Sequence, residues 1–485
     1  MTLRVLSLAS EAFPLVKTGG LADVAGALPD AVGPAGIEMT VMLPGYPVVM
    51  KGLKRAKLLH HYADLLGHEA RLLRGKIGVH PLVVLDAPGL FDRDGGAYGD
   101  QNGRDWADNW LRFAAFAKAG AELAAGVVGG GKPFDVLHAH DWQAAMAPAY
   151  LRFLHGDKGV APKSVMTIHN IAFQGQFART IFPKLGLPPA AWAMDGVEYY
   201  GDVGFLKAGL EAADAITTVS PTYAREIRTP GFGMGLEGLI VAKSDRVTGI
   251  VNGIDPAIWN PAHDPALAKT FTVRTLARRV ANKRAVEQAF GLEPGDGPLF
   301  IVISRLTWQK GMDVLAATLD HLVASGGRLA LLGSGDAALE NAFHQAAARH
   351  PGRVAVRIGY DEPLSHLMQG GGDAILVPSR FEPCGLTQLY ALAYGCVPVV
   401  ARTGGLADTV IDANVAALAA GTATGIQFDG LTLDSLSLAI SRTVRLYHQP
   451  ERWGAIQQCG MKSDFSWTHS GRAYADLYAR LCSPA

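Results

Sequence analysis

The amino-acid sequence predicts an α/β protein built on parallel β-sheets and large enough for two domains. Ten short apolar runs rich in β-branched residues are each followed by a turn and a helical pattern, which is typical of buried parallel strands in βαβ units. The 485 residues allow two large or about three average domains, and 49% of them are hydrophobic against 18% charged, which indicates a sizeable core. The predicted strands lie at 3–9, 38–43, 134–139, 164–169, 215–220, 299–304, 329–334, 354–359, 374–379 and 397–401.

Composition argues against several classes of protein. The 44 Lys and Arg residues balance 44 Asp and Glu residues, so the chain lacks the basic charge of a dedicated nucleic-acid binder. Its four cysteines show no CxxC spacing, which argues against a disulfide framework or a zinc cage and favours the cytoplasm. Glu11 and Pro14 interrupt the first apolar stretch, so we expect no signal peptide. The uncharged stretch 383–401 contains two prolines and two glycines and predicts a buried helix followed by a strand rather than a membrane span.

The loop after the first strand, KTGGL, is a candidate anion site. Gly19 and Gly20 allow backbone N–H groups to approach a phosphate and Lys17 adds a charge, although a solvated turn lysine is the alternative. The loop lacks the glycine spacing of a Walker A motif.

The hexapeptide TGGLAD at 18–23 overlaps this loop and recurs at 403–408, either by coincidence or because two related sheet domains present similar loops. Three prolines within 251–265 place the domain boundary near residue 250.

The segment HAHDW (138–142) puts two histidines and a carboxylate at a strand end, where ligands bind in open parallel sheets. Three interpretations stay open here: a metal site, a helix cap formed by Asp141, and binding of substrate hydroxyl groups. His169 in TIHN is, taken alone, consistent with a buried core histidine, and Asn252 is a further polar residue just after an apolar run.

The second half of the chain contains the strongest candidates for chemistry. Arg305 and Lys310 follow a strand within SRLTWQKG and suit a diphosphate, with a surface cation pair as the alternative. The G-x-G-x-x-A match at Gly333 is weak evidence for a dinucleotide site, because no acidic residue follows at the required spacing. Glu382, between a strand and a helix, either caps that helix or lies against a developing positive charge.

Together these segments resemble the bacterial and plant glycogen/starch synthase family along nearly the whole chain. The resemblance implies a GT-B fold, in which two Rossmann-like, doubly wound parallel-sheet domains surround a deep cleft. The domains implied are 1–250 on the acceptor side, 251–465 for the nucleotide-sugar, and a helix within 466–485 that returns to the first domain. The resemblance rests on the segments 10–24, 138–143, 167–175, 251–255, 304–311, 332–336, 382–395 and 403–410.

The same resemblance implies transfer of glucose from ADP-glucose to the non-reducing end of an α-1,4-glucan, such as glycogen, with retention of the anomeric configuration. We expect no cofactor and no metal, because Arg305 and Lys310 can neutralise the leaving diphosphate, and a UDP-sugar-dependent enzyme of the same fold is the alternative. The residues implied as catalytic are Glu382, His169, Asp141, Arg305 and Lys310. Those implied in donor binding are Lys17, Gly20, Asp23, Tyr98, Asn252, Gly335, Tyr360, Cys384, Gly385, Leu386 and Thr387.

One position departs from the wider group of retaining GT-B enzymes. Those with an E-x7-E motif have a second glutamate where this sequence has Tyr390. Without that carboxylate, same-face attack by the acceptor hydroxyl is favoured over a double displacement through a glycosyl-enzyme intermediate. Neither a nicotinamide oxidoreductase nor a non-catalytic glucan-binding module explains Arg305, Lys310 and Glu382 at strand ends.

Overall fold

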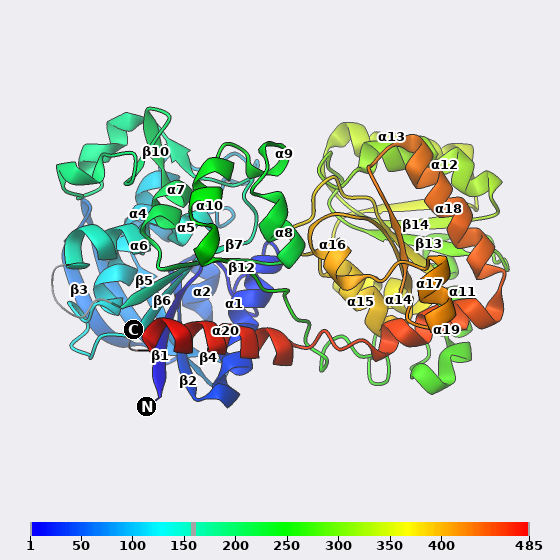
Figure 1. The fold of residues 1–485 in the computed structure, drawn as a ribbon, viewed down its shortest axis with the longest axis horizontal. Helices are drawn as coiled ribbons and strands as arrows, with labels where there is room; N and C mark the ends of the chain where they lie inside the picture. The colour runs from blue at the N-terminus through cyan, green and yellow to red at the C-terminus, as the bar shows by residue number, and fades with distance from the viewer. Residues whose placement is uncertain (1, 157–161, 484–485) are drawn as a thin grey trace. The chain divides into compact units, whose positions relative to one another are not determined.

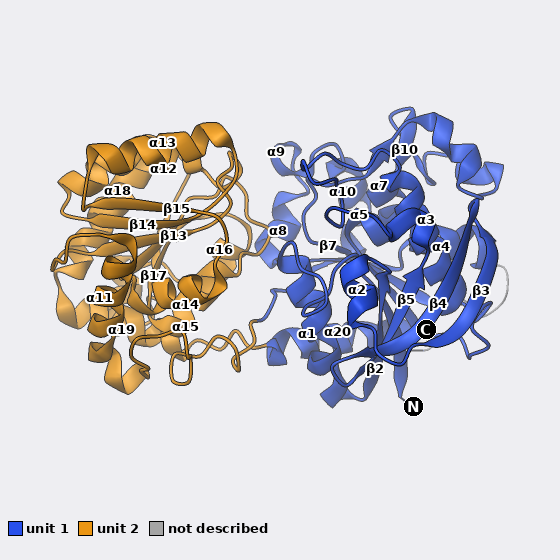
Figure 2. Ribbon diagram, turned by 180° about the vertical axis from the view of Figure 1, so that it is seen from behind, with its two compact units in different colours: residues 1–253, 467–485 blue, residues 254–466 orange. Residues whose placement is uncertain are grey.

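The computed structural model describes residues 2–156 and 162–483 and contains two compact units (Figures 1 and 2). Unit 1 comprises residues 1–253 and 467–485, and unit 2 comprises residues 254–466. All ten predicted runs form strands, and each is paired in parallel with a neighbour. The predicted fold class, α/β with two Rossmann-like parallel-sheet domains, is confirmed.

Unit 1 is built on a nine-stranded sheet in the order β12-β11-β7-β6-β1-β2-β5-β4-β3. The first seven strands in this order are parallel, whereas β4 and β3 form an antiparallel hairpin at one edge. That hairpin was not predicted, because β3 exposes most of its residues and so lacks a continuous apolar run. The strands are β1 Leu3–Leu8, β2 Ile37–Pro44, β3 Lys57–Leu65, β4 His68–Ile77, β5 His80–Asp86, β6 Val136–His140, β7 Lys163–Ile168, β11 Ala215–Thr218 and β12 Val247–Gly249.

Two helices far apart in the sequence share one core cluster of unit 1. Helix α1 (Gly20–Val32) buries Val24 and Leu28 in this cluster, and α20 (Trp467–Cys482) contributes Tyr474 and Tyr478. The other helices of unit 1 are α2 Pro47–Gly52, α3 Pro88–Phe91, α4 Asn109–Ala124, α5 Asp141–Ala144, α6 Met146–Tyr150, α7 Phe205–Ala212, α8 Pro221–Glu226, α9 Pro230–Gly233 and α10 Glu237–Ala242. A small antiparallel sheet in the order β8-β10-β9 consists of β8 Gln176–Phe177, β9 Glu198–Tyr199 and β10 Asp202–Gly204.

Unit 2 is built on a six-stranded, wholly parallel sheet in the order β15-β14-β13-β16-β17-β18. Helices α12, α13 and α18 contribute to the core on one face, and α11, α14 and α15 to the core on the other (Figure 2). The strands are β13 Leu299–Ile303, β14 Arg328–Gly333, β15 Val354–Ile358, β16 Ala374–Val377, β17 Val397–Ala401 and β18 Ile426–Phe428. The helices are α11 Arg279–Phe290, α12 Met312–Ala324, α13 Ala337–Arg349, α14 Glu362–Gly371, α15 Thr387–Tyr394, α16 Gly404–Thr409, α17 Val415–Ala420, α18 Leu433–Tyr447 and α19 Pro450–Lys462.

The uncharged stretch 383–401 forms α15 followed by β17, as the sequence predicts. Among the described residues, no helix is both long and apolar enough to cross a membrane.

The chain leaves unit 1 after Gly253 and re-enters it at Trp467. A Cβ on Gly253 would lie 2.7 Å from Trp467 Cα, so only glycine allows these two crossing segments to approach so closely.

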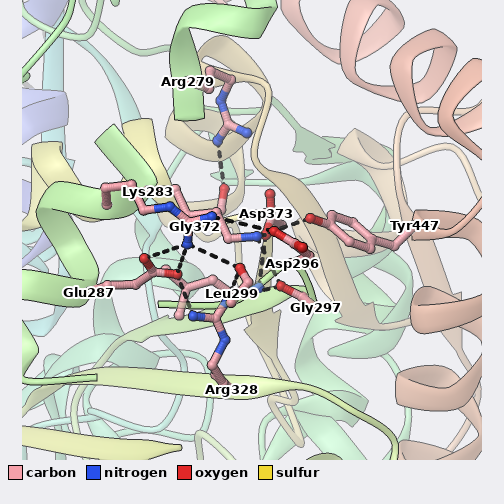
Figure 3. Close-up of polar contacts among 12 residues, drawn as sticks. Arg279, Lys283, Glu287, Asp296, Gly297, Leu299, Arg328, Gly372, Asp373 and Tyr447 are labelled. Atoms are coloured by element: carbon pink, nitrogen blue, oxygen red, sulfur yellow. Dashed lines mark hydrogen bonds and ion pairs between the residues drawn. The ribbon is translucent and has the colours of Figure 1, made fainter. Parts of the chain in front are cut away.

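Buried charges tie together the amino ends of strands in unit 2 (Figure 3). Asp373, which immediately precedes β16, lies 2.7 Å from Lys283 Nζ of α11 and accepts a hydrogen bond of 2.8 Å from Leu299 N of β13. Lys283 also donates to the carbonyl of Gly297 at 2.9 Å and to the Tyr447 hydroxyl at 3.0 Å. This cluster is a structural one, because ligands of parallel sheets bind at the opposite, carboxyl ends of the strands.

A second buried pair lies beside the first. Glu287 of α11 contacts Arg328, the first residue of β14, and Arg284 Nη1 at 2.7 Å. Arg328 Nη2 donates to the carbonyls of Gly295 and Gly297, each at 2.9 Å. The segment before β13 is therefore held against the sheet by side chains of α11 and β14.

We expect Asp373→Ala to lower the free energy of unfolding of unit 2 by about 3–5 kcal/mol, because it leaves the buried Lys283 ammonium without its counter-charge. The double variant Lys283→Met with Asp373→Ala should recover part of that loss. Urea unfolding followed by circular dichroism measures both. As a control, Asp429→Ala breaks the exposed ion pair with Arg402 and should cost no more than about 1 kcal/mol. Equal losses in the two single variants would contradict a special role for the buried pair.

Candidate active site

The residues singled out in the sequence gather in loops at the carboxyl ends of the parallel strands, where such sheets bind ligands. In unit 2 these loops follow β13, β14 and β16, which are consecutive or adjacent in the sheet. In unit 1 they follow β1, β6 and β7, which are also neighbours. Each unit therefore presents one group of functional side chains at the carboxyl ends of its strands.

In unit 2 the loops after β13 and β16 meet through a charged pair. Lys310 Nζ lies 2.5 Å from Glu382 Oε2, which also accepts a hydrogen bond of 2.8 Å from the Ser379 hydroxyl. Glu382 is 7% exposed. Its other oxygen, Oε1, has no hydrogen-bond partner among the described residues. The carboxylate is thus fixed through one oxygen and leaves the other for a substrate.

The helix-cap alternative for Glu382 is wrong. Helix α15 begins at Thr387 with Leu386 at its N-cap, and no side chain caps it. Gly385 has a φ of +73°, which favours glycine, and the preceding Cys384 is buried. The first amides of α15, from Thr387, have no partner within the helix, so the start of the helix presents N–H groups and the positive end of the helix dipole.

Arg305 differs from Lys310 although both belong to the loop after β13. Its side chain is exposed and makes no hydrogen bond or ion pair with any described residue. The loop itself is held by Arg380, which forms a two-armed ion pair with Asp313 at 2.6 and 2.8 Å and donates to the Trp308 carbonyl at 2.6 Å. The guanidinium of Arg305 is therefore an uncompensated cation on a well-supported loop.

The glycines after β14 serve close backbone packing. A Cβ on Gly333 would lie 1.9 Å from the Ser304 carbonyl oxygen, and one on Gly335 would lie 2.2 Å from that of Leu306. This packing accounts for the G-x-G spacing without a dinucleotide. Tyr360, which follows β15, is 74% exposed and donates to Glu362 Oε2 at 2.9 Å.

The two copies of TGGLAD have different environments although each begins a helix, α1 or α16. The second copy is largely buried, and a Cβ on Gly404 would lie 1.9 Å from the carbonyl oxygen of Glu382. In the first copy, Gly19 is exposed and a Cβ there would meet nothing within 4 Å. The second copy therefore supports the Glu382 segment, whereas the first leaves open space in front of its backbone.

In unit 1 a buried carboxylate, Glu11, organises the exposed loop. It accepts hydrogen bonds from the Thr18 amide, the Thr18 hydroxyl, the Gly19 amide at 3.2 Å and the Tyr98 hydroxyl. Burial, together with the negative charge of Glu11, holds the pKa of Tyr98 well above its usual value. Tyr98 therefore stays a neutral donor.

Lys17, the predicted phosphate contact, lies in the same loop. Its Nζ is 2.8 Å from Asp23 Oδ1 of α1, and both side chains are partly exposed. Gly20 is the first residue of α1, so the loop ends at a helix N-terminus. The loop thus offers one cation and the first amides of a helix to an approaching anion.

Asp141 does not cap the helix at Trp142, so that interpretation is wrong. Asp141 is the first residue of α5, with a φ of +54°, and its Oδ1 accepts hydrogen bonds from the amides of His169 at 2.7 Å and Asn170 at 3.3 Å. It therefore joins the loops after β6 and β7. Burial raises its pKa to about 7, with a smaller contribution from the charge of Glu11, while the two amides lower it.

The three histidines are buried and hydrogen-bonded. His138 contacts the Thr167 hydroxyl of β7 at 2.6 Å and the Tyr478 hydroxyl of α20 at 2.7 Å, so its two ring nitrogens join β7 to α20. His140 contacts His169 Nε2 at 2.9 Å. Burial lowers the pKa of His138 and of His169 to about 3, so both are neutral near pH 7.

His169 differs from the other two, because its Nδ1 has no partner among the described residues. The side-chain oxygen of Asn252, three residues beyond β12, is likewise buried without a hydrogen-bond partner there. In the described ranges no group of three or more His, Cys, Asp and Glu residues could hold a metal ion. The metal interpretation of HAHDW is therefore not supported.

Two supporting residues were not predicted. Glu11 lies three residues after the end of β1, and Arg380 lies between β16 and Glu382, so their position after a strand was a usable signal. What the sequence could not show is that their partners lie 7 to 87 residues away for Glu11 and 67 to 72 residues away for Arg380.

Comparisons with known proteins agree over the whole chain. A model of the starch synthase catalytic domain matches residues 4–242, and one of glycosyl transferases group 1 matches residues 283–456. Glycogen synthases of Novosphingobium aromaticivorans and Mesorhizobium japonicum are 71% and 58% identical to this chain over 481 residues, which cover 99% of each protein. The solved catalytic domain of starch synthase IV from Arabidopsis thaliana, bound to ADP and acarbose, is 30% identical, with a TM-score of 0.89 and full coverage of both chains.

The buried histidines predict an acid-sensitive fold. At pH 5 an unfolded histidine, with a pKa of about 6.5, binds a proton that native His138 does not, so lowering the pH from 7 to 5 should cost about 2 kcal/mol at this residue. Asp141 acts in the opposite direction, since its native carboxyl gains a proton in this range. In His138→Asn the loss of unfolding free energy between pH 7 and pH 5 should be about 2 kcal/mol smaller than in the wild type. An equal loss in both proteins would contradict a neutral native His138.

Proposed function

The chain belongs to the glycogen and starch synthase family of glycosyltransferases, and we propose that it transfers glucose from ADP-glucose to the non-reducing end of an α-1,4-glucan with retention of the anomeric configuration. The family predicted from the sequence motifs is thereby confirmed. The observation that carries the proposal is the free guanidinium of Arg305 in the same loop as Lys310, which forms an ion pair with Glu382.

The leaving group accounts for the two cations. Breaking the bond between the anomeric carbon and the diphosphate gathers negative charge on ADP, and preorganised cations stabilise that charge without reorganisation. Arg305 can bind two phosphate oxygens at once through its planar guanidinium group, whereas the Lys310 ammonium acts as a point charge. The amides at the start of α15, from Thr387, add partial positive charge at the same sheet edge.

Glu382 suits the positive charge that develops on the sugar. Lys310 and Ser379 fix its Oε2, and its free Oε1 is the atom that we place next to the anomeric carbon. Tyr390, at the position of the second glutamate in E-x7-E enzymes, stacks on Trp259 with ring centroids 3.6 Å apart. That position therefore serves packing, and a mechanism through same-face attack by the acceptor hydroxyl needs no second carboxylate.

Unit 1 supplies groups that suit sugar hydroxyls and phosphate. Neutral His169 offers Nδ1, and Asn252 offers an unpaired buried oxygen. Asp141 acts on the sugar through the backbone of the His169 loop, as a positioning residue. The open loop around Lys17 and Gly20 completes the donor contacts that we propose.

Three further assignments belong to the same proposal. Tyr360, exposed beyond β15, provides an aromatic face for the nucleotide base, and Gly335, beyond the neighbouring strand β14, provides a backbone contact. The acceptor is glycogen or a related α-1,4-glucan. The reaction takes place in the cytoplasm, in keeping with four cysteines that are all free thiols.

We expect kcat/KM with ADP-glucose to exceed that with UDP-glucose when glycogen is the acceptor. The assay measures release of the nucleoside diphosphate together with incorporation of labelled glucose into glucan. Nucleotide release that requires no glucan would indicate hydrolysis instead of transfer. A kcat/KM for UDP-glucose that equals or exceeds the value for ADP-glucose would favour the UDP-sugar alternative.

Arg305→Ala and Glu382→Gln should each lower kcat by about 10²–10³, the usual cost of removing one preorganised group from a transition state. Arg305→Lys should recover little, because an ammonium cannot reproduce the two-armed contact. Initial rates and thermal melting are measured on the same samples. Arg349→Ala, at an exposed arginine in α13, is the control and should keep wild-type rates. Wild-type rates in Arg305→Ala would refute the proposed diphosphate site.

A further inference from the structure

Two helices of unit 2 begin at the proposed donor site. Helix α14 starts at Glu362, whose carboxylate accepts a hydrogen bond of 2.9 Å from the hydroxyl of Tyr360, the residue that we place against the nucleotide base. Helix α15 starts at Thr387, whose amide we place near the diphosphate. The two helices lie side by side (Figures 1 and 2). Their relative position therefore sets the separation between the base subsite and the diphosphate subsite.

Helical spacing places three polar residues of each helix in one row, at i, i+4 and i+7 on α14 and at i, i+3 and i+7 on α15. The rows are Glu362, His366 and Gln369 on α14, and Thr387, Tyr390 and Tyr394 on α15. Gln369 Nε2 donates to the Thr387 carbonyl at 3.2 Å, and the Tyr394 hydroxyl lies 3.3 Å from His366 Nδ1. The two rows therefore face each other.

The indole ring of Trp259 stacks on a ring from each row. Its centroid is 3.8 Å from that of the His366 imidazole and 3.6 Å from that of the Tyr390 ring, with interplanar angles of 13° and 9°. Two rings that stack so close to one centroid must lie on opposite faces of the indole, since on one face they would overlap. Three parallel rings thus run from α14 through Trp259 to α15. Sliding of one helix along the other would break this stack.

A buried carboxylate joins the same two helices a second time. Asp264 is 4% exposed, and its Oδ2 lies 2.7 Å from His366 Nδ1 of α14 and accepts a hydrogen bond from the Tyr394 hydroxyl of α15. Its Oδ1 accepts a hydrogen bond of 2.9 Å from the amide of Ala266. A buried polar network of this kind specifies one arrangement of the side chains that form it. It therefore fixes the register of α14 and α15 in addition to packing them together.

We propose that Trp259 and Asp264 are positioning residues for the donor, which hold the base subsite and the diphosphate subsite at the separation that ADP requires. The proposal rests on the function and the donor site proposed above, and neither residue needs to touch the donor. A ligand with two linked parts gains affinity from both only when the two subsites lie at the matching separation. Loss of register should therefore weaken binding of ADP, which spans both subsites. Adenosine and pyrophosphate each occupy one subsite and should bind as before.

Trp259→Leu removes the central ring of the stack, and Asp264→Asn removes the charge but keeps the shape of the side chain. In each variant we expect the Kd for ADP and the KM for ADP-glucose to rise about tenfold, which corresponds to about 1.4 kcal/mol. The Kd values for adenosine and for pyrophosphate, and kcat, should change less than about twofold, because a uniform loss of donor binding leaves kcat unchanged. Trp259→Tyr keeps an aromatic ring in the stack and should recover most of the affinity. Isothermal titration calorimetry measures the three affinities, and initial rates give KM and kcat.

Trp453→Leu is the matched control. Trp453 of α19 is another tryptophan of unit 2, 6% exposed, but it belongs to the core cluster of α12, α13 and α18. Its loss should lower the melting temperature and leave the affinities for ADP, adenosine and pyrophosphate unchanged.

Wild-type affinity for ADP in folded Trp259→Leu and Asp264→Asn would overturn the proposal. An equal weakening of ADP, adenosine and pyrophosphate would also overturn it, since a general loss of structure would have that effect. If circular dichroism shows that Trp259→Leu does not fold, Asp264→Asn decides by the same comparison. If wild-type protein binds ADP but transfers no glucose to glucan, the proposed function fails instead. The binding comparison needs neither acceptor nor turnover, so it still decides the role of the two positioning residues.

Discussion

The parallel pairing of neighbouring strands is the constraint on which both units depend. Because neighbouring strands of the sheet run in one direction, their carboxyl ends lie on the same side of the sheet. Loops from distant parts of the sequence become neighbours there. Lys310 and Glu382 are 72 residues apart and form an ion pair only because β13 and β16 are adjacent in the sheet. The Lys283–Asp373 pair lies at the opposite, amino ends of the same strands. In unit 2 the charged residues that stabilise the fold therefore lie at one end of the strands, and the charged residues of the candidate active site lie at the other.

The fold and many of the site residues could be predicted, because their signals are local. A continuous apolar run predicts a buried strand, and a polar residue just beyond it predicts a position at the sheet edge. The β3–β4 hairpin escaped prediction because an edge hairpin with one exposed face has no such run. Glu11 and Arg380 escaped because their importance lies in what they contact. The histidines show the same limit. His138 and His169 look alike in sequence, but of these two only His169 has a ring nitrogen without a hydrogen-bond partner in the part of the chain that the structure describes.

The repeated hexapeptide TGGLAD shows how tertiary context changes the meaning of a motif. Both copies begin a helix, so the local conformation follows the sequence. In the first copy Gly19 leaves the backbone open to solvent, and Glu11 holds the loop by accepting the Gly19 amide hydrogen bond. In the second copy the same glycines allow the chain to pack directly on the backbone of Glu382. One copy can therefore face a ligand while the other supports a residue that does.

Unit 2 is a continuous insertion, whereas unit 1 is assembled from two separated pieces of the chain. This order has a consequence for synthesis on the ribosome. Residues 254–466 can fold as soon as they emerge, but the stripe of α1 that includes Val24 and Leu28 stays without Tyr474 and Tyr478 until α20 has been made. A segment synthesised early thus belongs to a core that is completed last, and its apolar stripe stays uncovered until α20 has been made.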